Sequence, residues 1–236
     1  MHIYALHEAA IVAQIAGAST PLCESIALAT DDPSDALYSF VGGNPLAPSW
    51  LAELDLPSTR IACWSGTLAY DAAEAGDLFA AHPHNWMGPG PDALRKFLDG
   101  IVDPLTSAQR TLCIIPHARH VLSDVQGAIN LIRERARQPI EVALAPIALL
   151  TPSMLEALDD HLERSFDTLA EHAPFLFLTD AVIDEEDDRL RPVALGNGII
   201  DRAKILDAID RYWPPEKPVV LLAENLAEQI SWLKDR

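Results

Sequence analysis

The sequence predicts an α/β fold of the (β/α)8 TIM-barrel type, in which a parallel sheet is wrapped by helices. Short apolar runs in the second half, each followed by a stretch with helical character, carry this prediction: Thr111–Pro116, Glu141–Pro146, Phe175–Asp180 and Val219–Asn225. An open doubly wound sheet would usually carry a glycine-rich phosphate turn after its first strand, and no such motif occurs in the sequence. We therefore expect a closed barrel that forms a single domain over residues 1–236.

The amino-terminal half shows the same alternation less regularly. Strands are predicted at Ile3–Leu6, Glu24–Thr30 and Arg60–Trp64. Helices are predicted at Glu8–Ala16, which Gly17 ends, and near Ser49–Leu54. Because the proline-rich stretch between these elements holds only a weak strand at Leu37–Val41, we expect a shortened or irregular strand in this half.

Amphipathic helices follow the strands of the second half. We expect a helix at Asp92–Leu105 with Asp92 as its cap, and one from Ser123 to Arg137 capped by Ser123 or Asp124. Further helices are predicted at Ser153–Ala173, Arg202–Tyr212 and Leu226–Leu233. The acidic run Asp184–Asp188 is interpreted as a solvated loop.

The formal charge of −18 argues against nucleic acid and anionic membranes as partners, because phosphate contacts need clustered Lys and Arg. No apolar run approaches the roughly 18–20 residues that span a bilayer, and the start MHIYALHEAA lacks the basic region of a secretory signal. Cys23, Cys63 and Cys113 have no metal-binding spacing, so we interpret them as small hydrophobic residues in a reducing compartment. We expect a cytoplasmic protein.

Five fragments follow one another in an order that is typical of a known superfamily. They are LCIIPHARH (Leu112–His120), EVALAP (Glu141–Pro146), FLFLTDA (Phe175–Ala181), LGNGIIDRAKILDAI (Leu195–Ile209) and VVLLAEN (Val219–Asn225). Together they resemble the xylose-isomerase-like TIM barrels, the sugar phosphate isomerase/epimerase superfamily. The resemblance implies carboxylates and a histidine at the strand ends, which hold a divalent metal ion that polarises a carbonyl or hydroxyl of the substrate.

Most of the metal ligands that the resemblance implies are missing from this sequence. The Glu that ends one strand falls on Ile115, the Asp of the next on Ala145, and the His of the third near Phe177. Asp180 matches the acid that follows this His, and Glu224 matches the last ligand. We therefore expect a degenerate member without a cofactor, in which a divalent metal is disfavoured.

The polar residues that remain near the strand ends are the candidate site. We expect Glu224, Asp180 and His117 to be catalytic, and His120, Arg119 and Trp64 to bind substrate. Alternatives stay open: His117 and His120 as histidines of a solvent-exposed loop, Asp180 as a turn cap, and Glu224 as the cap of the following helix.

These residues leave three functions open. The first is a barrel that binds a small polar metabolite or sugar, with weak acid/base chemistry at most. The second is an active metal-dependent isomerase or epimerase of a sugar or related polyol, with His82, His84, His117 and His120 as unusual ligands. The third is a non-catalytic structural or regulatory partner protein. A homodimer is compatible with each.

Overall fold

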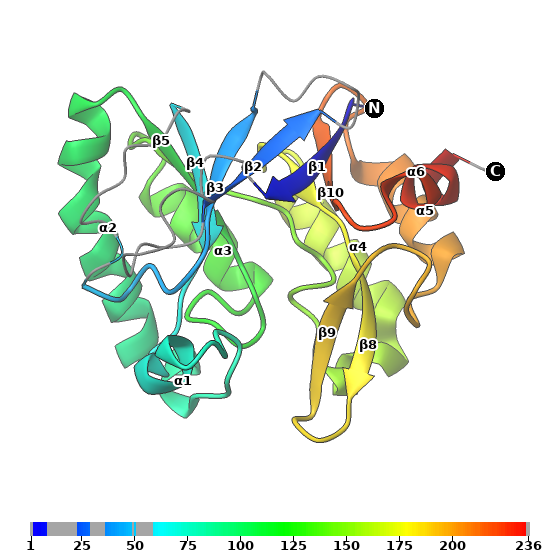
Figure 1. The fold of residues 1–236 in the computed structure, drawn as a ribbon, viewed down its shortest axis with the longest axis horizontal. Coiled ribbons are helices and arrows are strands. Elements are labelled where there is room, and N and C mark those ends of the chain that lie inside the picture. Colours follow the sequence, from blue (N-terminus) through cyan, green and yellow to red (C-terminus); the bar gives the residue numbers. More distant parts are fainter. Residues whose placement is uncertain (1, 9–22, 29–35, 49, 51–58, 235–236) are drawn as a thin grey trace.

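The computed structural model describes residues 2–8, 23–28, 36–48, 50 and 59–234, and its elements are labelled in Figure 1. The helices expected at Glu8–Ala16 and near Ser49–Leu54 lie outside these ranges, apart from Glu8 and Trp50. No helix in the described ranges is long and apolar enough to cross a membrane.

Eight strands form one sheet, in the spatial order β6-β5-β4-β3-β2-β1-β10-β7. They are β1 (His2–Glu8), β2 (Cys23–Leu28), β3 (Tyr38–Val41), β4 (Arg60–Trp64), β5 (Thr111–Ile115), β6 (Ile140–Val142), β7 (Leu176–Phe177) and β10 (Pro218–Leu222). The two ends of this order meet, because Leu144 and Leu176 form a parallel bridge. The Leu144 amide donates to the Phe175 carbonyl at 3.1 Å, and the Phe177 amide donates to the Leu144 carbonyl at 2.8 Å. The sheet is therefore closed, and the predicted barrel is confirmed.

The irregularity expected in the amino-terminal half is a reversed strand. β2 runs antiparallel to both of its neighbours, β1 and β3, whereas the other neighbouring strands are parallel. β3 has only four residues, within the segment Leu37–Val41 where a weak strand was predicted. Antiparallel neighbours need no crossover helix, so the usual helix between adjacent strands is not required at this point of the barrel.

Six helices of the described chain follow the later strands. They are α1 (Tyr70–Glu74), α2 (Pro89–Ser107), α3 (Val125–Glu134), α4 (Leu158–Leu169), α5 (Arg202–Tyr212) and α6 (Leu226–Lys234). Asp124 caps α3 as expected, since its carboxylate accepts a hydrogen bond from the Gly127 amide at 2.8 Å. In Figure 1, α2 and α3 cover the left side of the barrel and α4, α5 and α6 cover the right side.

Two of the helix predictions are wrong at their starts. α2 begins at Pro89 rather than at Asp92, because prolines fit the first helical turn, where their fixed φ suits the helix and no amide donor is needed. Asp92 lies in that first turn instead of capping it. The helix expected from Ser153 is a 3-10 helix at Pro152–Ala157, and only then does α4 begin.

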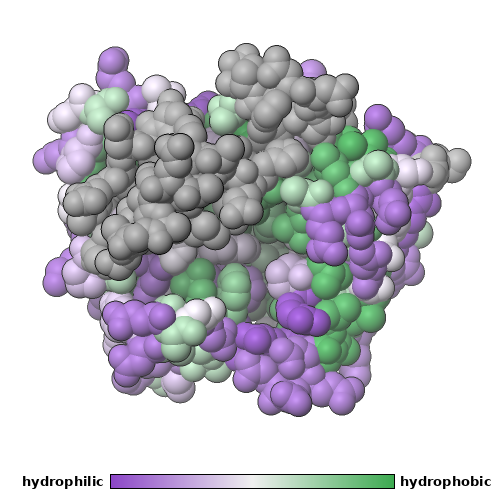
Figure 2. Space-filling view, in the orientation of Figure 1, coloured by the Kyte–Doolittle hydropathy of each residue, from purple (hydrophilic) through white to green (hydrophobic). Residues whose placement is uncertain are grey.

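A two-stranded hairpin interrupts the barrel after β7. Its strands are β8 (Asp180–Asp184) and β9 (Arg189–Val193), and they pair antiparallel. The strand predicted at Phe175–Asp180 therefore ends early, and Asp180 opens a different element. The acidic run is the turn of this hairpin, and Figure 2 shows hydrophilic side chains at that tip, on the lower edge of the molecule.

The barrel interior is an apolar cluster separate from the layer between strands and helices. Its fully buried members include Ile26, Tyr38, Ala62, Cys113, Ile115, Ala143, Ala145, Phe175 and Val220. Cys63 belongs to the outer layer, and both Cys63 and Cys113 are buried free thiols, as their sequence context predicts. At the amino end of the interior, the Tyr38 hydroxyl donates to the Glu141 carboxylate at 2.8 Å.

Candidate functional site at the carboxyl end of the barrel

Aromatic rings fill the barrel mouth, where the carboxyl ends of the strands meet. Trp64 ends β4, and its ring centroid lies 5.6 Å from that of His117 and 5.8 Å from that of His120. Phe79, from the loop after α1, lies 4.5 Å from His117 and stacks on His120 at 5.1 Å. Phe177 meets Trp64 edge-on at 5.9 Å. We call these five residues the mouth cluster, which unites three of the predicted site residues.

The two histidines of the mouth cluster are buried, which corrects the alternative of a solvent-exposed loop. His117 is 5% exposed and His120 is 0% exposed. The Arg119 amide donates to Nδ1 of His117 at 3.1 Å. Nε2 of His120 lies 3.2 Å from the Leu78 carbonyl and donates to it, while its Nδ1 has no hydrogen-bond partner among the described residues.

Burial keeps both imidazoles neutral. It lowers the pKa of His117 well below the ordinary value, and the nearby His120, Arg119 and Arg189 lower it further. Burial also lowers the pKa of His120 to about 3, although the hydrogen bond to Leu78 opposes this shift. Near neutral pH the pair therefore offers no positive charge. Because Nδ1 of His117 and Nε2 of His120 already make hydrogen bonds, the nitrogens that are left are a donor Nε2 on His117 and an acceptor Nδ1 on His120.

The Arg119 side chain contacts the turn of the hairpin. Its guanidinium donates to the carbonyl oxygens of Asp187 and Asp188, the latter at 2.8 Å. It therefore joins the loop after β5 to the turn between β8 and β9. The substrate-binding role expected for Arg119 stays a prediction, because these two bonds use only one nitrogen of its guanidinium.

A second arginine joins the hairpin to the loop that carries Phe79. The Arg189 guanidinium lies 3.1 Å from Asp77, 3.2 Å from Asp184 and 3.3 Å from Asp187. Its side chain is only 21% exposed, so these ion pairs are partly shielded from solvent. The ion pairs of Arg189 and the hydrogen bonds of Arg119 together hold the hairpin over the mouth cluster.

The carboxylate of Asp180 is buried and fully occupied by backbone amides. Its Oδ1 accepts from Ala181 at 2.8 Å and from Ile200 at 3.0 Å, and its Oδ2 accepts from Gly196 at 3.2 Å and from Gly198 at 3.0 Å. Gly196 has a φ of +87°, and a Cβ at position 198 would overlap both the Ala181 carbonyl and Oδ1 of Asp180. The Gly-Asn-Gly segment is thus folded around this carboxylate.

Glu224 lies just beyond β10 and is exposed. Its backbone carbonyl accepts a hydrogen bond from the Gln229 side chain at 2.6 Å, which joins the end of β10 to α6. In the part of the chain that the structure describes, no hydrogen bond or ion pair joins Glu224 or Asp180 to the mouth cluster. The three predicted catalytic residues are therefore not assembled into one constellation.

The positions of the missing metal ligands belong to the apolar interior. Ile115, Ala145 and Phe177 are 1%, 0% and 4% exposed, and all three lie in the interior cluster. Their side chains carry no atom that binds a metal ion, so these residues do not fit the metal that the resemblance implies. Among the described residues, no three His, Cys, Asp or Glu side chains converge as a metal site.

A small cavity lies between the mouth cluster and the hairpin. Trp64, His117, Phe177, Thr179, Leu190 and Pro192 are among the residues that line it. It has room for about one water molecule. Thr179 and Phe79 were missed in the sequence: Thr179 stands beside Asp180 in a recognised strand end, whereas no motif marks Phe79.

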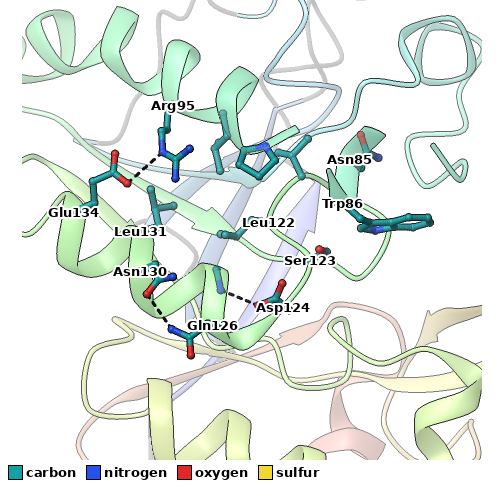
Figure 3. A pocket seen from close by; sticks show the side chains of 14 residues that line it. Asn85, Trp86, Arg95, Leu122, Ser123, Asp124, Gln126, Asn130, Leu131 and Glu134 are labelled. Atoms are coloured by element: carbon teal, nitrogen blue, oxygen red, sulfur yellow. Dashed lines mark hydrogen bonds and ion pairs between the residues drawn. The ribbon is translucent and has the colours of Figure 1, made fainter. Parts of the chain in front are cut away.

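A larger groove of 370 Å³ lies outside the barrel, between α2 and α3. Figure 3 shows Arg95 and Glu134 at one end and Trp86, Ser123 and Asp124 at the other. Leu94, Leu122 and Leu131 form its apolar floor. Ser123 and Asp124 were recognised in the sequence only as candidate caps of the helix that follows, and none of these residues was predicted to form a groove.

No family model and no curated protein sequence matches this chain. It is similar in structure to the xylose isomerase domain protein from Planctomyces limnophilus (13% identity, TM-score 0.45, covering 75% of this chain and 55% of that one). It is also similar to a xylose isomerase-like TIM barrel protein from Mycobacterium smegmatis in complex with magnesium (13% identity, TM-score 0.48, covering 80% and 64%). An L-ribulose 3-epimerase is a third (14% identity, TM-score 0.44, covering 73% and 52%).

The chain thus spans between 52% and 64% of the length of these three proteins. The barrel assignment rests on the strand order and on the Leu144–Leu176 bridge rather than on this similarity.

Proposed function

We propose that this protein is a small-metabolite-binding barrel of the sugar isomerase/epimerase type that works without the metal chemistry of that superfamily. The observation that carries the proposal is the burial of Ile115, Ala145 and Phe177 in the apolar interior. Replacing three strand-end ligands by packed apolar side chains removes the Lewis acid that a sugar isomerase of this type needs. The mouth of the barrel nevertheless keeps polar groups.

The mouth suits a neutral ligand with several hydroxyl groups. Nε2–H of the neutral His117 ring can donate a hydrogen bond, and Thr179 adds a hydroxyl at the cavity wall. The Trp64 ring offers an apolar face for the C–H groups of a sugar or polyol. An ionised ligand would be disfavoured, because burial here penalises charge.

Binding requires the hairpin to move, since the closed cavity holds about one water molecule. The polar contacts that resist this movement include the ion pairs of Arg189 and the hydrogen bonds of Arg119. These contacts are partly exposed, and opening would also expose Leu190, which is packed in the core. The hairpin would then act as a lid over the mouth.

Calorimetric titration of the protein with neutral monosaccharides and polyols, in the presence of EDTA, tests the proposal. We expect chelator-independent binding that Thr179→Val weakens by about three- to tenfold, the value of one hydrogen bond. Thr106→Val is the matched control, because Thr106 lies on the exposed side of α2 and bonds only to its own helix at Val102. A stoichiometric divalent ion with EDTA-sensitive binding, or no binding at all, would contradict the proposal.

A second candidate is the non-catalytic partner protein. The observation that favours it is the exposure of Trp86 (51%) and Met87 (58%) beside the α2–α3 groove. Exposed Trp and Met side chains are enriched in protein–protein interfaces. This surface is separate from the barrel mouth, so the two candidates do not exclude each other.

A further inference from the structure

The α2–α3 groove combines an apolar floor with an exposed aromatic rim. Leu94, Leu122 and Leu131 on the floor are 3%, 4% and 5% exposed. Trp86 lies at the open end and is followed by Met87, and both side chains are more than half exposed. The leucine floor is almost completely buried, so the apolar surface that a partner can cover is supplied mainly by Trp86 and Met87.

The rim is held in place before any partner arrives. The Trp86 indole donates to the Ala118 carbonyl at 2.8 Å, and the Asn85 amide donates to the Arg119 carbonyl at 2.7 Å and to the Thr67 hydroxyl at 2.9 Å. These bonds fix the short 3-10 helix Pro83–Trp86 against the loop after β5. The indole is therefore already ordered at its end of the groove, so that a partner loses little affinity to ordering it.

The side chains that line the groove include more acidic residues than basic ones. Of the residues that line it, Arg95 is the only basic one, and it is already paired with Glu134 at 3.4 Å and with Asp92 at 3.3 Å. Asp124 at the open end is exposed and accepts the amide of Gly127 through Oδ1. The whole chain has a formal charge of −18, so the surrounding field has the same sign.

We infer that this groove docks a basic amphipathic segment of a partner protein. Apolar side chains of the segment would cover Leu94, Leu122 and Leu131 and pack against Trp86, and a Lys or Arg would lie beside Asp124. Helices recognised in grooves use such an apolar stripe, and opposite charge at the rim steers the encounter. The groove volume of 370 Å³ suits a few side chains of such a segment.

The test is fluorescence anisotropy with two labelled helical peptides. Both carry Leu at i, i+3, i+4 and i+7, and their remaining positions are Lys in one peptide and Glu in the other. We expect the Lys peptide to bind the full-length protein and the Glu peptide not to bind. Because the chain is acidic throughout, charge alone would attract the Lys peptide, so variants in the groove decide the result.

Two matched pairs of variants separate the groove from general attraction. Asp124→Asn keeps the helix cap but removes the charge, and should weaken binding about three- to fivefold, whereas Asp160→Asn on α4 should not. Gly127→Ala places a methyl group in the groove 3.4 Å from Leu122 and should weaken binding about tenfold. Gly100→Ala gains the same helix propensity in open space and should bind like the unmodified protein.

Three results would overturn the inference. The first is that all four variants bind the Lys peptide equally, which would show that the net charge of the protein attracts the peptide. The second is preference for the Glu peptide, or no binding of the Lys peptide. The third is a dimer, measured by light scattering, that Gly127→Ala dissociates, because the groove would then be occupied by a second copy of the chain.

Discussion

The Arg189 guanidinium on strand β9 lies 3.1 Å from the Asp77 carboxylate, which precedes Phe79 in the loop after α1. This ion pair joins two segments more than 100 residues apart, and both lie over the carboxyl end of the barrel. The same guanidinium contacts Asp184 and Asp187 within its own hairpin. Arg189 is therefore, with Arg119, one of two arginines that hold the hairpin over the mouth cluster.

Replacing Arg189 should loosen the hairpin without unfolding the barrel. We expect Arg189→Gln to lower the free energy of unfolding by about 1–2 kcal/mol, because partly shielded ion pairs are lost. Hydrogen exchange should become faster in residues 180–193. Arg211→Gln, whose partners Asp207 and Glu163 are exposed, is the control and should change stability by less than about 0.5 kcal/mol. Unchanged exchange in the hairpin would show that Arg189 does not hold it.

Removing one oxygen from the Asp180 carboxylate should destabilise the whole protein. In Asp180→Asn, a side-chain NH2 group faces backbone amides that need an acceptor, and we expect a loss of about 3–5 kcal/mol in urea unfolding. Asp201→Asn changes an exposed helix cap to another good cap and should cost less than about 0.5 kcal/mol. Similar costs for the two variants would contradict the role given to Asp180.

The buried histidines should make stability depend on pH in the acid range. Their pKa values are lower in the folded protein than in the unfolded chain, so below the ordinary histidine pKa of about 6.5 the unfolded chain binds more protons. Stability should fall as pH drops below that value, by about 1.4 kcal/mol per pH unit for each histidine until its folded pKa is reached. At higher pH these two groups should contribute no slope.

Urea unfolding between pH 5 and pH 8 measures this slope. His120→Gln keeps a neutral donor near the Leu78 carbonyl but cannot titrate. Below pH 6.5 it should therefore reduce the slope of the unfolding free energy against pH by the contribution of about one proton. The slope of the unmodified protein, measured under the same conditions, is the comparison. An identical slope in the His120 variant would show that this ring is accessible to protons in the folded state.

The buried hydroxyl of Tyr38 should contribute to stability far more than an exposed one. Tyr38→Phe removes the buried hydroxyl that donates to the Glu141 carboxylate at the amino end of the barrel interior, and we expect a loss of about 1–3 kcal/mol. Tyr212→Phe removes a hydrogen bond of the same 2.8 Å length to Glu163 on the exposed surface. It should cost less than about 0.5 kcal/mol, and equal losses would mean that burial does not matter at Tyr38.

Several parts of the fold could be predicted from local patterns. Apolar runs set the positions of β4, β5 and β10, and the caps Asp124 and Asp201 set the starts of α3 and α5. The apolar residues Ile115, Ala145 and Phe177 were predicted to leave no metal ligand at three strand ends, and they lie in the interior cluster. These features depend on neighbours a few residues away, so a single sequence is enough to predict them.

Other parts depend on which distant segments meet. The antiparallel direction of β2 cannot be predicted from its own residues, because a strand of this composition can pair in either direction. The hairpin β8–β9 was missed because its acidic turn looks like any solvated loop. Asp180 was expected at a reactive site, yet its partners Gly196, Gly198 and Ile200 enclose it from a loop that follows the hairpin.

The sequence by itself determined the barrel class, most of the helices and the apolar character of the three strand ends, because periodicity and residue type are local properties. Only the tertiary structure decided that Phe79, from a loop without a motif, stacks on His120, and that Arg189 fastens the hairpin to Asp77. The physical reason is that the pKa, the hydrogen bonds and the access of a side chain depend on burial. Burial is decided when segments far apart in the chain pack together.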